Sequence, residues 1–197
     1  MIPTKVFVTH MLEQAKTVPR NLGWVQHSFA VGDTAGTIAN ALNKAGYDLD
    51  IEKATLLGYL HDIGKMVGPY TAHMQNGYHY LKELGFPEEY CDICIIHSYI
   101  TNDPFLVISE IVYDEEIIQH VQNHQHTIYE RLVNLCDLMC DLQTMTVDQR
   151  LIDVISRHGT CKSTQKHVQE VHKLKQYFDE MLGYNLYSLF PSIYENL

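Results

Sequence analysis

The sequence contains no apolar run that approaches the roughly 20 residues needed to span a bilayer. Residues 1–17 carry charged side chains where a secretory signal peptide would have its apolar centre. The five cysteines are an odd number without a secretory signal, which is typical of reduced thiols. These absences together predict a soluble, cytoplasmic protein with no membrane partner.

Basic side chains are also few. The chain has 14 Lys and Arg against 24 Asp and Glu, and its formal net charge is −10. Affinity for a long nucleic-acid backbone comes mainly from Lys and Arg that release counterions, so the sequence argues against an extended nucleic-acid partner. A small anionic substrate remains compatible with this balance, because bound cations would reverse the local sign of the charge.

The composition is that of a globular protein, with 46% apolar and 19% charged residues in a chain of 197. We expect a single domain, residues 1–197, with a core at about 20–160 and a C-terminal helix and apolar tail at 163–197. Helical periodicity and capping residues predict an all-α bundle of about eight helices. Their expected ranges are 4–17, 23–45, 51–63, 71–84, 87–99, 114–141, 147–158 and 163–182.

Two segments do not fit this helical pattern. Residues 105–112 are apolar and β-branched enough for a short strand or an irregular lid, so the sequence leaves the role of residues 102–126 open. The tail at 184–197 is rich in Leu, Tyr, Phe and Ile. An apolar tail of this kind either folds back on the domain or binds another subunit, which makes a homodimer through the tail possible.

The dipeptide His61-Asp62 is the strongest indication of function in the sequence. His61 shares a helical stripe with apolar residues from Ile51 onward, so its imidazole points into the core beside the carboxylate of Asp62. Burying both groups is costly without a cation between them. Gly64 would give the backbone the freedom to end the helix and let Asp62 reach the same point. The alternative is a histidine with a local hydrogen-bond partner beside a capping aspartate.

Two further polar residues lie on otherwise apolar helical faces. His27 shares a stripe with Val31, and Asp137 shares one with Val133, so both could converge on the His-Asp pair. A His, a His-Asp pair about thirty residues later and a late Asp resemble the ligand order of the HD superfamily of metal-dependent phosphohydrolases. The segments that carry the resemblance are Arg20, His27-Ser28, Asp48, residues 54–65 with His61-Asp62-Ile63-Gly64-Lys65, Asp137 and residues 147–159.

The resemblance also raises the question of how many metals bind. The four ligands His27, His61, Asp62 and Asp137 suit one cation. His73 and His97 look like the two extra histidines of two-metal HD proteins, such as bacterial symmetrical diadenosine tetraphosphate hydrolases and HD-GYP phosphodiesterases. The Gly-Tyr-Pro motif of the latter group is absent.

The expected cofactors are one or two divalent transition metals, because imidazoles mixed with carboxylates favour Fe, Mn, Co or Zn over Ca or Mg. Asp62 would bridge the two cations, and a metal-activated water would attack phosphorus in a nucleotide-like small molecule. Lys65, one turn past His61, and Arg20 would bind the substrate phosphate. Arg131 is a weaker candidate for the same role, and each of these cations could instead form a surface ion pair.

Other readings remain open. Some HD relatives are di-iron oxygenases, and a non-catalytic sensor or scaffold could keep the fold. Paired cysteines, Cys91-x2-Cys94 with Cys136-x3-Cys140, could hold zinc, but the spacings also match neighbouring helical positions. His120, His124 and His126 include an i, i+4 pair, which we expect to be a solvated face.

Overall fold

The computed structural model describes residues 2–108 and 114–195, and these form an all-α structure without a β-strand. The α-helices of this part are α1 (Lys5–Lys16), α2 (Leu22–Lys44), α3 (Ile51–Leu60), α4 (His73–Glu83), α5 (Glu88–Cys91), α6 (Ile93–Ile96), α7 (Glu115–Asn123), α8 (Ile128–Asp137), α9 (Val147–His158), α10 (Thr164–Leu182) and α11 (Pro191–Glu195). Short 3-10 helices are η1 (Pro19–Asn21), η2 (Ile63–Met66), η3 (Tyr70–Ala72) and η4 (Leu186–Leu189). The all-α prediction is confirmed.

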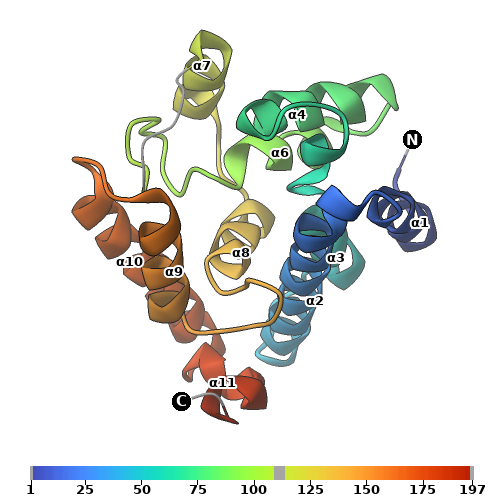
Figure 1. Ribbon diagram of the computed structural model, residues 1–197. Coiled ribbons are helices and arrows are strands. Elements are labelled where there is room, and N and C mark those ends of the chain that lie inside the picture. Colours follow the sequence, from blue (N-terminus) through green and yellow to red (C-terminus); the bar gives the residue numbers. More distant parts are fainter. Residues whose placement is uncertain (1, 109–113, 196–197) are drawn as a thin grey trace.

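Helices α2, α3 and α8 form the centre of the molecule. The long α2 lies along α3, and both pack on α8, while α4 and α6 lie near one end and α9 and α10 cover another side (Figure 1). Fully buried aliphatic side chains such as Ile38, Leu42 and Leu56 fill the space between them. The burial of this apolar surface stabilises the bundle and fixes the positions of α2, α3 and α8 relative to one another.

Three expected helices are shorter than predicted or split. The helix expected at 51–63 ends at Leu60, the one at 87–99 breaks at Asp92, and the one at 114–141 breaks between α7 and α8. The last break has a local cause, because Thr127 and Glu130 form a capping box that starts a new helix. Of the α-helices in the described residues, α5, α6 and α11 have only four or five residues, and the other eight agree with the expected number.

The segment that resisted prediction contains no strand in its described part, because residues 102–108 form turns and bends. The remainder of the expected strand or lid, at 109–112, lies outside the described residues.

The apolar tail folds back on the bundle. Leu186, Phe190 and Ile193 are buried in the main hydrophobic cluster, whereas Tyr184 and Tyr194 are exposed. The homodimer through this tail stays a prediction. None of the described helices has the length and apolar character required to cross a membrane.

All five cysteines are free thiols. In the described chain they do not gather into a group of ligands for a metal. Cys91 and Cys94 instead donate to the backbone carbonyls of Phe86 and Leu60.

Candidate metal centre

Close packing of glycines brings the first helices of the site together. A Cβ atom on Gly58 of α3 would lie 2.5 Å from the Cα atom of Gly32 on α2, so both positions require glycine. This contact places His27 of α2 beside His61, the residue that ends α3.

The turn after His61 packs equally tightly. A Cβ atom on Gly64 would lie 1.9 Å from the carbonyl oxygen of His73, at the start of α4. Gly64 does not have a positive φ, so the expectation that it supplies backbone freedom was wrong. Its function is to let the turn that carries Asp62 approach α4.

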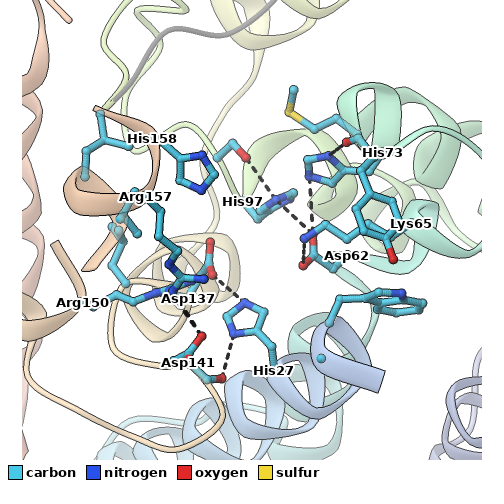
Figure 2. Close-up of a pocket in the computed structure, with 18 of the residues that line it drawn as sticks. His27, Asp62, Lys65, His73, His97, Asp137, Asp141, Arg150, Arg157 and His158 are labelled. Atoms are coloured by element: carbon cyan, nitrogen blue, oxygen red, sulfur yellow. Dashed lines mark hydrogen bonds and ion pairs between the residues drawn. The ribbon is translucent and has the colours of Figure 1, made fainter. Parts of the chain in front are cut away.

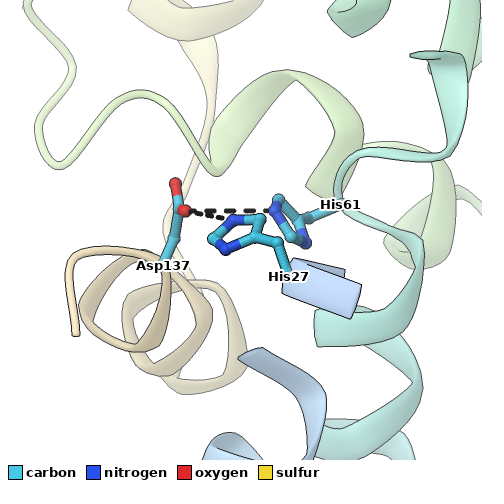
Figure 3. Close-up of side chains that lie close together, drawn as sticks. All are labelled: His27, His61 and Asp137. Carbon is cyan, nitrogen blue, oxygen red and sulfur yellow. Dashed lines mark hydrogen bonds and ion pairs between the residues drawn. The ribbon is translucent and has the colours of Figure 1, made fainter. Parts of the chain in front are cut away.

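His27, His61 and Asp137 form one triad (Figure 3). The Nε2 atoms of His27 and His61 lie 2.9 and 4.0 Å from Oδ1 of Asp137. The Nδ1–H of His27 donates to the carbonyl oxygen of Asp141 (3.0 Å), and that of His61 donates to the carbonyl oxygen of Gly58 (2.7 Å). In its neutral form each ring presents the lone pair of Nε2 to the carboxylate, so the contact calls for a proton or a cation between them.

Asp62, His73 and His97 form a second triad against the first. Oδ1 of Asp62 lies 3.4 Å from Nε2 of His73 and 3.9 Å from Nε2 of His97. The Nδ1–H groups of these rings donate to the carbonyl oxygens of Tyr70 and Ile93. Backbone carbonyls thus fix the orientation of all four imidazoles, an arrangement typical of metal-ligating histidines.

Asp62 belongs to the second triad and also contacts the first. Its Oδ2 atom is 3.5 Å from Nε2 of His61 and also pairs with the ammonium of Lys65, while its Oδ1 atom faces His73 and His97. Both Asp62 and His61 are almost fully buried. The two oxygens of Asp62 thus face different imidazoles, and the bridging role expected of Asp62 stays a prediction.

Burial and charge set the protonation states of the site. Burial lowers the pKa of His73 and of His97 to about 4, so both rings are neutral near neutral pH and can offer a lone pair. Burial acts to raise the pKa of Asp137, but its hydrogen bond to His27 and the neighbouring imidazoles outweigh this and lower it. Burial likewise opposes the lowering of the pKa of Asp62, where the charge of Lys65 is the largest of the outweighing effects.

The donor atoms of the two triads are suited to bind a metal ion. Nε2 of His61 is buried and lacks a hydrogen-bond partner among the described residues. A buried imidazole nitrogen of this kind is costly unless something outside the chain binds it. Each triad consists of two imidazoles and one carboxylate, a donor set that suits Zn, Fe, Mn or Co better than Ca or Mg. The two triads could hold one cation each.

A cavity of about 840 Å³ opens above the two triads (Figure 2). Arg20 and Lys65 line it, and their role in binding a substrate phosphate stays a prediction. Arg131 instead lies over the ring of Tyr177, with its guanidinium carbon 5.9 Å from the ring centroid, and does not line the cavity.

The opposite wall of this cavity was not expected from the sequence. Arg150, Arg157 and His158 of α9 line it, as Figure 2 shows. Arg150 contacts the carboxylates of Asp153 (2.8 Å) and Asp141 (3.6 Å), and Arg157 also pairs with both. The two arginines are seven residues apart, hence on one helical face, and this spacing was the available signal.

Comparisons with known proteins identify the family of this chain. The family model described as HD domain matches residues 24–145, a range that contains all six residues of the two triads. The uncharacterized protein MJ0778 of Methanocaldococcus jannaschii is 32% identical over 123 residues, which cover 56% of this chain and 73% of that protein. No solved structure matches the chain significantly. Since the matched range is more than half of the sequence, the chain belongs to the HD domain family.

Proposed function

We propose that the protein is a metal-dependent phosphohydrolase that cleaves a phosphoester or phosphoanhydride bond in a nucleotide-like small molecule. One observation carries the proposal. The two triads have the same donor set, they meet at Asp62, and they lie at the base of a cavity that several cationic side chains line. In the HD family, metal-dependent hydrolysis of phosphorylated substrates is the general activity.

The six side chains would hold two cations, with His27, His61 and Asp137 on one and His73 and His97 on the other. Asp62 would contact both, since its two oxygens face different triads. When bound, such cations act as Lewis acids on a phosphoryl group and lower the pKa of water. The backbone carbonyls that accept from the four Nδ1–H groups keep each ring in the tautomer that ligation requires.

Cationic side chains would bind and orient the substrate. The ammonium of Lys65 reaches Oδ2 of Asp62, so a phosphate bound above Asp62 lies within its range. Arg157 of α9 approaches from the opposite wall, and its planar guanidinium suits two phosphate oxygens at once. The cavity has the volume of a site for one small molecule, which supports a nucleotide over a polymer.

Three further parts of the proposal concern the substrate class, the cellular location and the number of domains. The pattern of His73 and His97 supports a relationship to the diadenosine tetraphosphate hydrolases, and a dinucleoside polyphosphate therefore belongs in the first substrate panel. Free thiols at all five cysteines support a cytoplasmic location. The main hydrophobic cluster contains residues of α1 to α6 and of α8 to α11, which supports one domain over residues 1–197.

A di-iron oxygenase is the second candidate, because two imidazoles and one carboxylate are also the ligands of non-haem iron in oxygenases. A scaffold is disfavoured, since buried polar groups such as His61 and Asp62 cost stability unless they bind something.

One experiment separates the two enzymes. Metal-stripped protein is reloaded with manganese without oxygen and given nucleotides, a dinucleoside polyphosphate and an aryl phosphate. A phosphohydrolase releases phosphate or nucleotide under these conditions, and Asp62→Asn protein does not. Turnover that requires both iron and oxygen would replace the hydrolase with the oxygenase.

A further inference from the structure

A third group of metal-ligating side chains lies outside the cavity. Asp92, His120 and His124 each offer one ligand atom, and these three atoms lie within 4.8 Å of one another. Asp92 stands at the junction of α5 and α6, His120 lies on α7, and His124 ends α7. Residues that are distant in the sequence thus meet at one point.

We propose that Asp92, His120 and His124 bind one further divalent transition metal, such as Zn²⁺, which clamps α7 to the start of α6. Two imidazoles and one carboxylate are a frequent zinc donor set, and the positions that they leave open would be taken by water.

The environment of these histidines is not that of a solvated face, so our expectation for His120 and His124 was wrong. Their side chains are only 21% and 13% exposed. Nε2 of His120 is buried and 3.1 Å from Oδ1 of Asp92, yet the contact lacks the alignment of a hydrogen bond. A buried nitrogen that faces a carboxylate without a well-formed hydrogen bond is an unsatisfied polar group, and a cation bound between the two would satisfy both.

The ring of His124 is held in place by Glu130. Nε2 of His124 lies 2.8 Å from Oε1 of Glu130, and the other oxygen of Glu130 accepts from the backbone N–H and the hydroxyl of Thr127. Glu130 is 2% exposed, so its carboxylate is fixed. A carboxylate that orients a ligating histidine is a recurrent feature of zinc sites.

The two imidazoles are also arranged as a pair. Their rings are stacked at a centroid distance of 5.6 Å and an angle of 15°, as the i, i+4 spacing at the end of α7 allows. The side chain of Asp92 approaches this pair from the α5–α6 junction.

A metal at this point would secure a helix that has a limited apolar anchor. Helix α7 is set apart from the central helices and lies near α4 and α6 (Figure 1). It contributes Ile117 and Val121 to a small second hydrophobic cluster, which also contains Ile95 and Ile96 of α6. Helix α6 ends at His97, so the clamp would hold the helix that carries one residue of the second triad.

The test is a Zn²⁺ titration of metal-stripped, full-length protein against a chromophoric chelator. Wild-type protein should bind one equivalent more than His120→Asn protein and one more than Asp92→Asn protein. This difference is independent of the central triads, whether they bind two, one or no cations. The matched control is His79→Asn, which removes an exposed histidine that pairs with Glu116 of α7 and should leave the stoichiometry unchanged.

A second measurement needs no variant. Zn²⁺ added to the wild-type protein should slow amide hydrogen exchange in α7 and at the α5–α6 junction. Equal stoichiometry in wild-type, His120→Asn and Asp92→Asn proteins would overturn the proposal. If a variant does not fold, unchanged exchange in α7 of the wild-type protein would overturn it as well.

Discussion

Gly58 of α3 lies so close to Gly32 of α2 that a Cβ atom on Gly58 would be 2.5 Å from the Cα atom of Gly32. The nearest obstacle is backbone, which cannot move aside as the end of a flexible side chain can. The separation of α2 and α3, and with it the distance between His27 and His61, depends on the absence of two side-chain carbons.

Gly58→Ala should therefore destabilise the protein and weaken metal binding together. Overpacking against backbone costs about 1–3 kcal/mol or more, because the helices must separate. Gly23→Ala on α2 is the control, since a Cβ atom there meets nothing within 4 Å. Urea unfolding and metal analysis should show losses in the first variant alone. Equal stability of Gly58→Ala and wild-type protein would contradict the role of this contact.

The sequence was sufficient for features that depend on local periodicity. His27, His61 and Asp137 were expected at one site because helical stripes place them on core-facing sides, and the structure brings them together. Asp62 was expected beside them because it follows His61 at a helix end, and its carboxylate does face His61. His73 and His97 came from the resemblance to the HD superfamily, and they join the same site. That any of these side chains ligates a metal stays a prediction.

Features that depend on tertiary contacts could not be predicted in this way. The tight approach of Gly64 to α4 arises from helix packing, which residue spacing does not encode. The spacing of Arg150 and Arg157 places both on one face of α9, but it does not show that this face lines the cavity. The break before α8 could have been predicted, because Thr127 and Glu130 form a capping box. The helical spacing of apolar residues on both sides of the break favoured one continuous helix instead.

Arg157→Gln should raise the KM for the phosphorylated substrate more than it lowers kcat. A charged hydrogen bond contributes about 1.5–3 kcal/mol, which corresponds to about a 10- to 100-fold change in affinity. Steady-state kinetics with the substrate identified in the panel would measure KM and kcat separately. The control is Arg131→Gln, because Arg131 stacks over Tyr177 outside the cavity. An unchanged KM in Arg157→Gln protein would exclude the arginine from substrate binding.

Metal-free protein should lose stability as the pH falls from 6.5 toward 4. Burial lowers the pKa of His73 and of His97 from 6.5 to about 4, so the unfolded chain binds protons in this range before the folded chain does. Their contribution is fully present above pH 6.5 and is lost on acidification. Burial also acts to lower the pKa of His27, but Asp137 raises it overall, and this partly offsets the trend.

Urea unfolding with a chelator present, at intervals across this pH range, would measure the slope. His73→Asn protein should show a shallower slope than wild-type protein, because one of the two groups no longer titrates. A free energy of unfolding that is constant across the range would contradict the assigned pKa shifts.

His97→Ala should remove one metal equivalent and reduce activity by orders of magnitude. His97 belongs to the second triad, so its loss should leave the cation held by His27, His61 and Asp137 in place. Losing one half of a two-metal site removes several kcal/mol of transition-state stabilisation, and about 1.4 kcal/mol corresponds to each factor of ten in rate. Elemental analysis and phosphate release would measure the two effects.

The matched control is His167→Ala. His167 is buried, its Nδ1–H donates to the carbonyl oxygen of Leu106 (3.2 Å), and burial lowers its pKa, much as for His97, but it belongs to neither triad. Removing either histidine should cost about 1–3 kcal/mol of stability, because a buried hydrogen bond from the imidazole to a backbone carbonyl is lost. Only His97→Ala should also lose metal. If both variants melt earlier and keep full metal content and activity, His97 is a core residue and the centre is mononuclear.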